Sequence, residues 1–129
     1  MVPIPEQVRR DLQNRLEKHA RTEWNERCAR VEIRFRGEYA YIDAFESDPW
    51  VMPDASEEEK ERIRQTPTKL CRLTWTGDAD SWKFAFYTYS NERYEPSITF
   101  DGSFTGTPES CFDTAAQAYL LERAQPGTN

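Results

Sequence analysis

The spacing of the hydrophobic residues changes once in the first third of the chain, and this change constrains the fold more than any other feature. At first the apolar side chains recur at every fourth position, as Val8, Leu12, Leu16, Ala20 and Trp24. That spacing predicts an amphipathic helix over residues 5 to about 29, with Pro5 at its start. From residue 31 the apolar positions alternate with charged ones, which is the period of a β-strand. We therefore expect a helix that lies across a sheet.

Two alternating segments on either side of Gly37 predict a β-hairpin. The first consists of Val31, Ile33 and Phe35 with charged residues between them, and the second is EYAYIDAFE. A short turn joins them, and Gly37 can take a positive φ there because it has no side chain. The two strands are therefore expected to pair in antiparallel fashion.

A second hairpin is expected from the segments KLCRLTW and WKFAFYTYS. The latter carries aromatic rings on both faces, which favours a central position in the sheet. A polar loop is expected at residues 91–96. Beyond it, the Asp101-Gly102 turn signal between Phe100 and Phe104 predicts a fifth strand or a small extra hairpin.

The region between the two hairpins, residues 47–68, is rich in proline and charge and is expected to be a variable loop or a short helix. Ser56 and Glu59 have the spacing of a capping box, which favours an exposed helix starting after Ser56. Near the end of the chain, Thr107 and Pro108 predict the N-cap and first residue of a last helix.

Together these elements predict a single small α+β domain over residues 1–129, with a mainly antiparallel sheet of four to five strands bracketed by an N-terminal and a C-terminal helix. The apolar stretches are far shorter than the roughly 20 residues that span a bilayer, and the first residues lack a signal-peptide core. We therefore expect a soluble protein with no membrane partner. Three widely spaced cysteines favour reduced thiols and a cytoplasmic location.

Charge is distributed unevenly along this acidic chain. The formal net charge is -6, yet residues 1–36 hold nine Lys and Arg against six Asp and Glu. The predicted first helix contributes a candidate anion-binding row of four cations, namely Arg9, Arg10, Arg15 and Lys18. The net charge makes nucleic acid an unfavoured partner. Nucleic-acid binding through this basic helix remains an alternative, as does base stacking on Tyr87 and Tyr89 beside Lys83.

The sequence lacks the residue spacings of common catalytic and cofactor sites. Its single histidine, His19, leaves at most one imidazole base, and Cys28 lies about 13 Å further along the same predicted helix. No Cys or His pair has metal-ligand spacing, and the five glycines form no phosphate cradle. We therefore predict no cofactor and no metal. A small hydrolase that uses carboxylates such as Glu38, Asp43 and Glu46 remains an alternative.

Tyrosine and arginine supply the residues that we expect to form a binding surface. These residues are Arg34, Tyr39, Tyr41, Tyr87, Tyr89 and Tyr94. Protein interfaces favour Tyr, Trp and Arg, so the sequence favours a noncatalytic module that binds a protein or a small ligand. Two other uses of the rings stay open. They could close the domain core, and they could support a homodimer through the sheet or the first helix.

Overall fold

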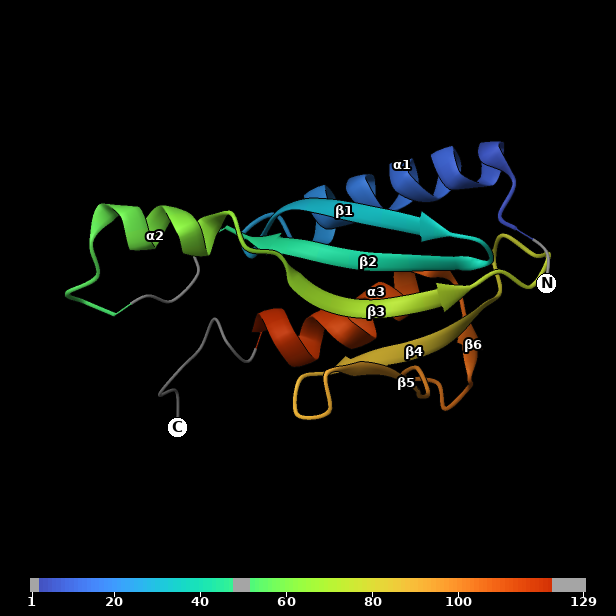
Figure 1. Ribbon diagram of the computed structural model, residues 1–129. Coiled ribbons are helices and arrows are strands. Elements are labelled where there is room, and N and C mark those ends of the chain that lie inside the picture. Colours follow the sequence, from blue (N-terminus) through green and yellow to red (C-terminus); the bar gives the residue numbers. More distant parts are fainter. Residues whose placement is uncertain (1–2, 48–51, 122–129) are drawn as a thin grey trace.

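A computed structural model describes residues 3–47 and 52–121 (Figure 1). Its elements follow one another as α1 (Glu6–Glu23), β1 (Cys28–Arg36), β2 (Tyr39–Glu46), α2 (Glu57–Arg64), β3 (Thr68–Thr74), β4 (Trp82–Thr88), β5 (Arg93–Pro96), β6 (Thr105–Gly106) and α3 (Pro108–Ala116). A π-helical turn over Gln117–Leu121 continues α3. The α+β class that the sequence predicts is confirmed.

The predicted apolar stripe buries α1 against the sheet, but the helix is shorter than expected. Leu12, Leu16 and Ala20 are buried on its inner face. The last helical hydrogen bond runs from the backbone N–H of Trp24 to the carbonyl of Ala20, and the N–H of Cys28 then turns back to the Trp24 carbonyl. The prediction of a helix to about residue 29 is therefore wrong, because the chain must reverse here for β1 to pass over the helix.

The strands form one antiparallel sheet in the order β1-β2-β3-β4-β5, with β6 beside β4. Both predicted hairpins are present, and Gly37 takes a φ of 60° in the turn of the first. As expected, β4 is an inner strand, with β3 on one side and β5 and β6 on the other.

The fifth strand lies where the sequence predicts a polar loop. β5 pairs Tyr94 with Tyr87 and Pro96 with Ala85. The turn at Gly102 exists, with a φ of 81°. The residues before it form no strand, and the expected strand in this segment is present only as the short β6 after the turn, which pairs with β4. A proline at the end of an edge strand is tolerated because no further strand needs its missing N–H, and the Tyr94 ring packs on β4.

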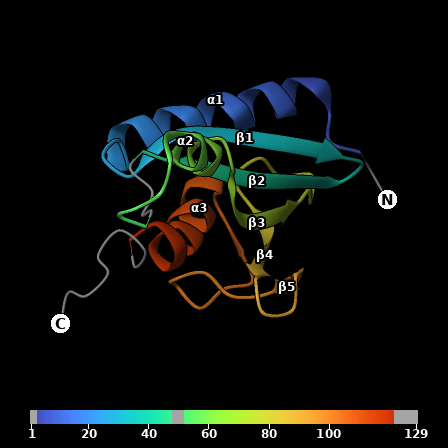
Figure 2. The same ribbon diagram turned by 60° about the vertical axis from the view of Figure 1, so that its left-hand side comes forward.

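The helices are arranged so that one face of the sheet stays open. α1 and α3 pack on the same face and contact each other (Figures 1 and 2). The short helix α2 is capped by the Ser56 hydroxyl, as expected, but buries none of its residues and lies beyond one end of the strands. No described helix covers the second face of the sheet.

The core lies between the sheet and the two packed helices. Its members include Ile42, Leu73, Trp82 and Phe112, each at most 1% exposed. The Thr107 hydroxyl caps α3, as predicted. On this helix the Phe112 ring packs edge to face with His19 and Trp24. None of the helices in the described part of the chain is long and apolar enough to cross a bilayer.

Candidate functional site

The face of the sheet that turns away from α1 and α3 collects large polar and aromatic side chains from all five main strands. Cross-strand partners share a face, so the pairs Arg34–Tyr41, Tyr41–Arg72 and Tyr87–Tyr94 lie on this side. We call it the cationic sheet face. It consists of Arg30, Glu32, Arg34, Arg36, Tyr39, Tyr41, Asp43, Phe45, Lys69, Arg72, Thr74, Lys83, Ala85, Tyr87, Tyr94 and Pro96.

The charge of this face has the opposite sign to that of the chain. Six of its side chains are cationic and only two are acidic, which gives a formal charge of +4. The whole chain carries -6. The acidic residues therefore lie mostly elsewhere, and the face produces a local positive potential that favours anionic partners.

Cations and rings alternate across the face and contact one another. The Arg72 guanidinium lies 4.5 Å from the centre of the Tyr39 ring and 5.9 Å from that of Tyr94. Arg34 lies 5.2 Å from the centre of the Tyr41 ring. These separations are within the range of attractive cation–π contacts. Similar contacts join Lys69 to Tyr87 at 4.9 Å and Arg30 to Phe45 at 3.9 Å.

The tyrosine rings meet edge to face, so the layer is packed. Tyr94 lies 5.1 Å from Tyr41 and 4.9 Å from Tyr87, measured between ring centres, with interplanar angles of 61° and 64°. Tyr87 is buried, whereas Tyr41 and Tyr94 are half-buried. The rings have few rotamers left to lose when a partner binds, which lowers the entropic cost of association.

An ion pair lies within this layer. Arg34 Nε donates to Asp43 Oδ2 at 3.1 Å, and Arg34 Nη2 donates to the Tyr94 hydroxyl at 3.3 Å. Burial raises the pKa of Asp43, and the Arg34 guanidinium offsets only part of that effect. Burial, with the nearby Asp43 charge, raises the pKa of Tyr94 to about 12. The Tyr94 hydroxyl is therefore protonated at neutral pH.

One donor inside the layer has no partner among the described residues. The Nε atom of Arg72 is buried and makes no hydrogen bond there. Its guanidinium is held by the rings of Tyr39 and Tyr94. Arg72 is thus fixed in place by stacking, which leaves its charge unneutralised by any ion pair in residues 3–47 and 52–121.

Five of the six residues expected to form a binding surface lie together on this face: Arg34, Tyr39, Tyr41, Tyr87 and Tyr94. The sixth, Tyr89, follows β4 at the margin, where its hydroxyl bonds to the backbone N–H of Lys69 at 2.7 Å. Whether these residues bind a partner stays a prediction.

Sequence reasoning missed Lys69 and Arg72 as members of the face. The signal was available in part, because residue 72 lies between the core positions 71 and 73 of a predicted strand and so must point outward. Lys69 reaches the face through a register shift between β2 and β3. A single sequence does not reveal such a shift.

The four cations of the predicted anion-binding row lie on α1 but differ in their surroundings. Arg10 pairs with Glu6 at 2.7 Å, and Arg15 is engaged by α3. Arg9 and Lys18 are exposed and form no ion pair with any residue in the described ranges. Two of the four are therefore unneutralised, and anion binding by this row stays a prediction.

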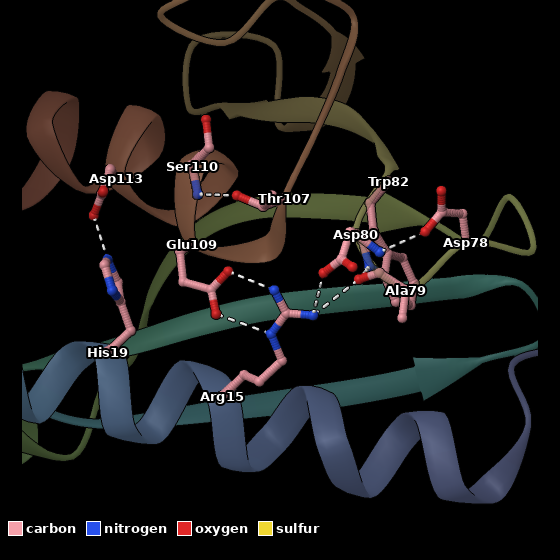
Figure 3. A network of polar contacts seen from close by, with 10 residues as sticks. All are labelled: Arg15, His19, Asp78, Ala79, Asp80, Trp82, Thr107, Glu109, Ser110 and Asp113. Carbon is pink, nitrogen blue, oxygen red and sulfur yellow. Dashed lines mark hydrogen bonds and ion pairs between the residues drawn. The ribbon is translucent and has the colours of Figure 1, made fainter.

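A polar network, which we call the helix clasp (Arg15, His19, Trp24, Asp80, Glu109 and Asp113), joins α1 to α3. Figure 3 shows its members except Trp24. Arg15 donates to both carboxylate oxygens of Glu109, at 2.8 and 2.9 Å, and pairs with Asp80 at 3.0 Å. His19 Nε2 lies 2.7 Å from Asp113 Oδ1. Every member has a partner inside the network, so the clasp functions as a brace.

The thiols are not activated, and no metal site is assembled among the described residues. Burial raises the pKa of Cys28 to about 11 and of Cys111 to about 12, and that of Cys71 well above its usual value, so the thiols stay protonated. Glu38 and Glu46 are separated by most of β2, about 27 Å at ~3.4 Å per residue. Within residues 3–47 and 52–121, no three His, Cys, Asp or Glu side chains could hold a metal ion.

Comparisons with known proteins supply no family for this chain. No protein-family model, no curated protein and no solved structure matches it.

Proposed function

We propose that this protein is a noncatalytic binding module whose contact surface is the cationic sheet face and whose partner presents acidic groups. The observation that carries the proposal is the inversion of charge, +4 on one face of a chain of -6. Charge of one sign concentrated on one surface steers and selects a partner of the opposite sign. The partner is a protein or a small ligand.

Two exposed cations give the face donors that the fold itself does not use. Arg36 and Lys83 lie at the same end of the sheet, opposite Tyr39 and Thr74 respectively, and neither forms an ion pair within the described ranges. The packed tyrosines beside them supply apolar area and hydroxyl groups at low entropic cost. This combination of Tyr and Arg is typical of binding hot spots.

The ring geometry favours acidic groups over nucleic-acid bases. A base stacks on the open face of an aromatic ring. Here Arg34 lies over Tyr41, and Arg72 lies over Tyr39. Because the chain's own cations occupy these ring faces, a base has no free ring face on which to stack there. Carboxylates, which pair with the cations, are therefore favoured over bases as partners. Nucleic-acid binding, through this face or through α1, is the alternative that the experiment below distinguishes.

The test uses a fluorescein-labelled decaglutamate peptide as the probe and fluorescence anisotropy at low ionic strength as the readout. Arg36→Gln and Lys83→Gln each remove one exposed cation from the face, and Lys18→Gln removes one from α1. We expect each face variant to weaken binding about two- to fivefold and the double variant about tenfold, from the usual worth of an exposed ion pair. We expect Lys18→Gln to bind like the parent protein.

Three results would contradict the proposal. The first is no binding of decaglutamate at low ionic strength, and the second is an equal loss in Lys18→Gln, which would move the anion site to α1. The third is tighter binding of single-stranded oligothymidylate with the same dependence on Arg36 and Lys83, which would favour nucleic acid. Carboxylate-dependent hydrolysis of any substrate would replace the noncatalytic assignment with the hydrolase alternative.

The proposal also includes a cellular location and an oligomeric state. The three cysteines are free and buried, which fits the cytoplasmic location that we propose. Homodimerisation through the sheet or α1 is the competing use of the same surfaces, and light scattering that finds a single 15.2 kDa species would exclude it.

A further inference from the structure

The outer edge of β1 has backbone groups that point away from the sheet. The carbonyl of Val31 accepts a hydrogen bond from Gln13 Nε2 at 3.1 Å, and the carbonyl of Gly37 accepts one from the N–H of Ile4 at 3.0 Å. Both donors lie outside the sheet, on the α1 side. Because successive residues of a strand point their backbone groups to opposite edges, the N–H and C=O of Ile33 and Phe35 point outward as well.

These outward groups are available to a further strand. β1 is the edge strand of the sheet, and β2 is its partner on the other side. In the described part of the chain, no side chain or loop bonds to the backbone of Ile33 or Phe35. Among the described residues, Gln13 is the one side chain that hydrogen-bonds to an outward backbone group between Val31 and Phe35. An exposed edge of this kind is a template for strand addition.

A groove runs between this edge and α1. One part, of about 480 Å³, is lined by Glu6, Arg9, Arg10, Gln13, Asn14 and Phe35. A second part, of about 210 Å³, has Glu17, Arg21, Arg30 and Val31 in its lining. The bond from Gln13 to Val31 lies between the two parts. The two parts therefore lie toward opposite ends of β1, one at Phe35 and the other at residues 28–31.

The two faces of β1 present different chemistry to an added strand. Arg30, Arg34 and Arg36 belong to the cationic sheet face, with Glu32 as the one acid among them. The alternate residues Val31, Ile33 and Phe35 are apolar and turn toward α1. Side chains directly opposite one another on neighbouring strands interact, and opposite charges there are favourable. A complementary strand thus alternates acidic and apolar residues.

We infer that the edge of β1 binds an extended peptide segment of a partner protein in which acidic and apolar residues alternate, and that the segment adds to the sheet as a further strand. The occupant follows from charge complementarity, because Arg30, Arg34 and Arg36 outnumber the single acid of β1 on the cationic sheet face. Of these three, Arg36 forms no ion pair in the described ranges. This inference rests on the proposed function, since the acidic side chains would lie on the cationic sheet face.

The experiment compares two labelled octapeptides of identical composition. One alternates glutamate and valine, and the other has four glutamates followed by four valines. Strand addition places every glutamate of the alternating peptide on one face, so we expect it to bind about tenfold more tightly than the block peptide, as several cross-strand pairs imply. Equal binding of the two peptides would overturn the inference even if decaglutamate binds to the cationic sheet face.

Ile33→Pro tests the edge itself. It removes an outward N–H, and proline is tolerated on an edge strand whose N–H is not in the ladder. We expect this variant to lose the preference for the alternating peptide while decaglutamate binding is unchanged. Ile33→Val, which keeps the N–H, is the matched control. Arg36→Gln should weaken decaglutamate binding about two- to fivefold and keep the preference for the alternating peptide. That result would support both the cationic sheet face and the β1 edge as binding sites.

A measurement on the unmodified protein covers the case in which Ile33→Pro does not fold. We expect the alternating peptide to slow amide hydrogen exchange at Ile33 and Phe35 and to leave Arg34, whose N–H faces β2, unchanged. Unchanged exchange at Ile33 and Phe35 would overturn the inference. The inference would also be overturned if the parent protein is a dimer and the Ile33→Pro variant is a monomer, because a second copy of the chain would then occupy the edge of β1.

Discussion

Two arginine–carboxylate pairs in this molecule show how differently the same chemistry can be used. In the helix clasp, Arg15 forms two bonds of 2.8 and 2.9 Å with Glu109. On the cationic sheet face, Arg34 reaches Asp43 at 3.1 and 3.4 Å. Asp43 is the more buried carboxylate, with its side chain 6% exposed against 29% for Glu109. The Arg15–Glu109 pair thus has the shorter hydrogen bonds, and the Arg34–Asp43 pair has the more buried carboxylate.

The pKa values of the two acids move in opposite directions as a result. Burial acts to raise the pKa of Glu109, but the bonds from Arg15 and from the backbone outweigh it and the net shift is downward. Burial dominates at Asp43, and its pKa is raised. The clasp therefore stabilises the fold through its charges, whereas the pair on the face keeps a buried carboxylate beneath a half-exposed arginine. The Arg34–Asp43 pair therefore contributes less to the stability of the fold than the Arg15–Glu109 pair does, and part of the Arg34 guanidinium stays accessible to a partner.

Removal of Arg15 is expected to have the largest effect on stability. Arg15→Ala takes away the partner of Glu109 and Asp80 together and the bond to the Ala79 carbonyl. We expect a loss of about 2 kcal/mol in the free energy of unfolding, measured with urea. Lys18→Ala on the same helix is the control and should change the value by less than about 0.5 kcal/mol. A smaller loss for Arg15→Ala than for the control would show that the clasp is not a brace.

The pair on the sheet face should cost less to break. Arg34→Ala removes the counter-ion of Asp43, but Arg34 is half exposed and water can replace part of the interaction. We expect a loss of about 1 kcal/mol at neutral pH. The loss should shrink in acid, because protonation of Asp43 removes the need for a counter-ion. An effect as large as that of Arg15→Ala would contradict the contrast between the two pairs.

The dependence of stability on pH separates the two acids by sign. Because the pKa of Glu109 is lowered in the folded protein, its carboxylate stabilises the fold at pH values above 4.5, the pKa of the unfolded state. This stabilisation is lost as the pH falls through the folded-state pKa. Because the pKa of Asp43 is raised in the folded protein, its protonated form stabilises the fold at pH values below 3.8, the pKa of the unfolded state. This stabilisation is lost as the pH rises through the folded-state pKa. At neutral pH we therefore expect Glu109→Gln to lower Tm and Asp43→Asn to maintain or raise it.

In acid both differences should disappear, because the parent carboxylates are then protonated. Thermal unfolding followed by circular dichroism across the acid range checks both curves. Two variants whose Tm differences carry the same sign at neutral pH would refute the assignment of opposite shifts.

The smallest effect is expected at the Tyr94 hydroxyl. Tyr94→Phe keeps the ring contacts with Tyr41 and Tyr87 and removes one acceptor for Arg34. We expect a loss of about 0.5 kcal/mol, the lower end for one hydrogen bond. The variant should also lack a late phase, near pH 12, in the ultraviolet titration of the tyrosines, because Tyr94 has a pKa of about 12. A titration identical to that of the parent would place the late phase on another tyrosine.

Local patterns in the sequence were sufficient to predict most elements. The four-residue spacing predicts α1, the alternation around Gly37 predicts β1 and β2, and Ser56 and Thr107 predict the starts of α2 and α3. These features depend on residues a few positions apart, which is why one sequence reveals them. The end of α1 and the position of β5 were mispredicted, because chain reversal and strand pairing depend on distant neighbours.

The candidate site shows the same division. Alternation within a strand tells which residues share a face, and so Arg34, Tyr39 and Tyr41 could be grouped from the sequence of the first hairpin. The stacking of Arg72 between Tyr39 and Tyr94 could not, since it requires the order of the strands.

The sequence by itself determined the net charge, the helix and strand periods and the supply of tyrosine and arginine on alternate positions. Tertiary structure decided which charges remain free. Arg15 is neutralised by Glu109, 94 positions away, while Arg36 and Lys83 keep their charges on an open face. The physical reason is that the effect of a charge depends on the distance and burial of its neighbours, and packing brings those neighbours from any part of the chain.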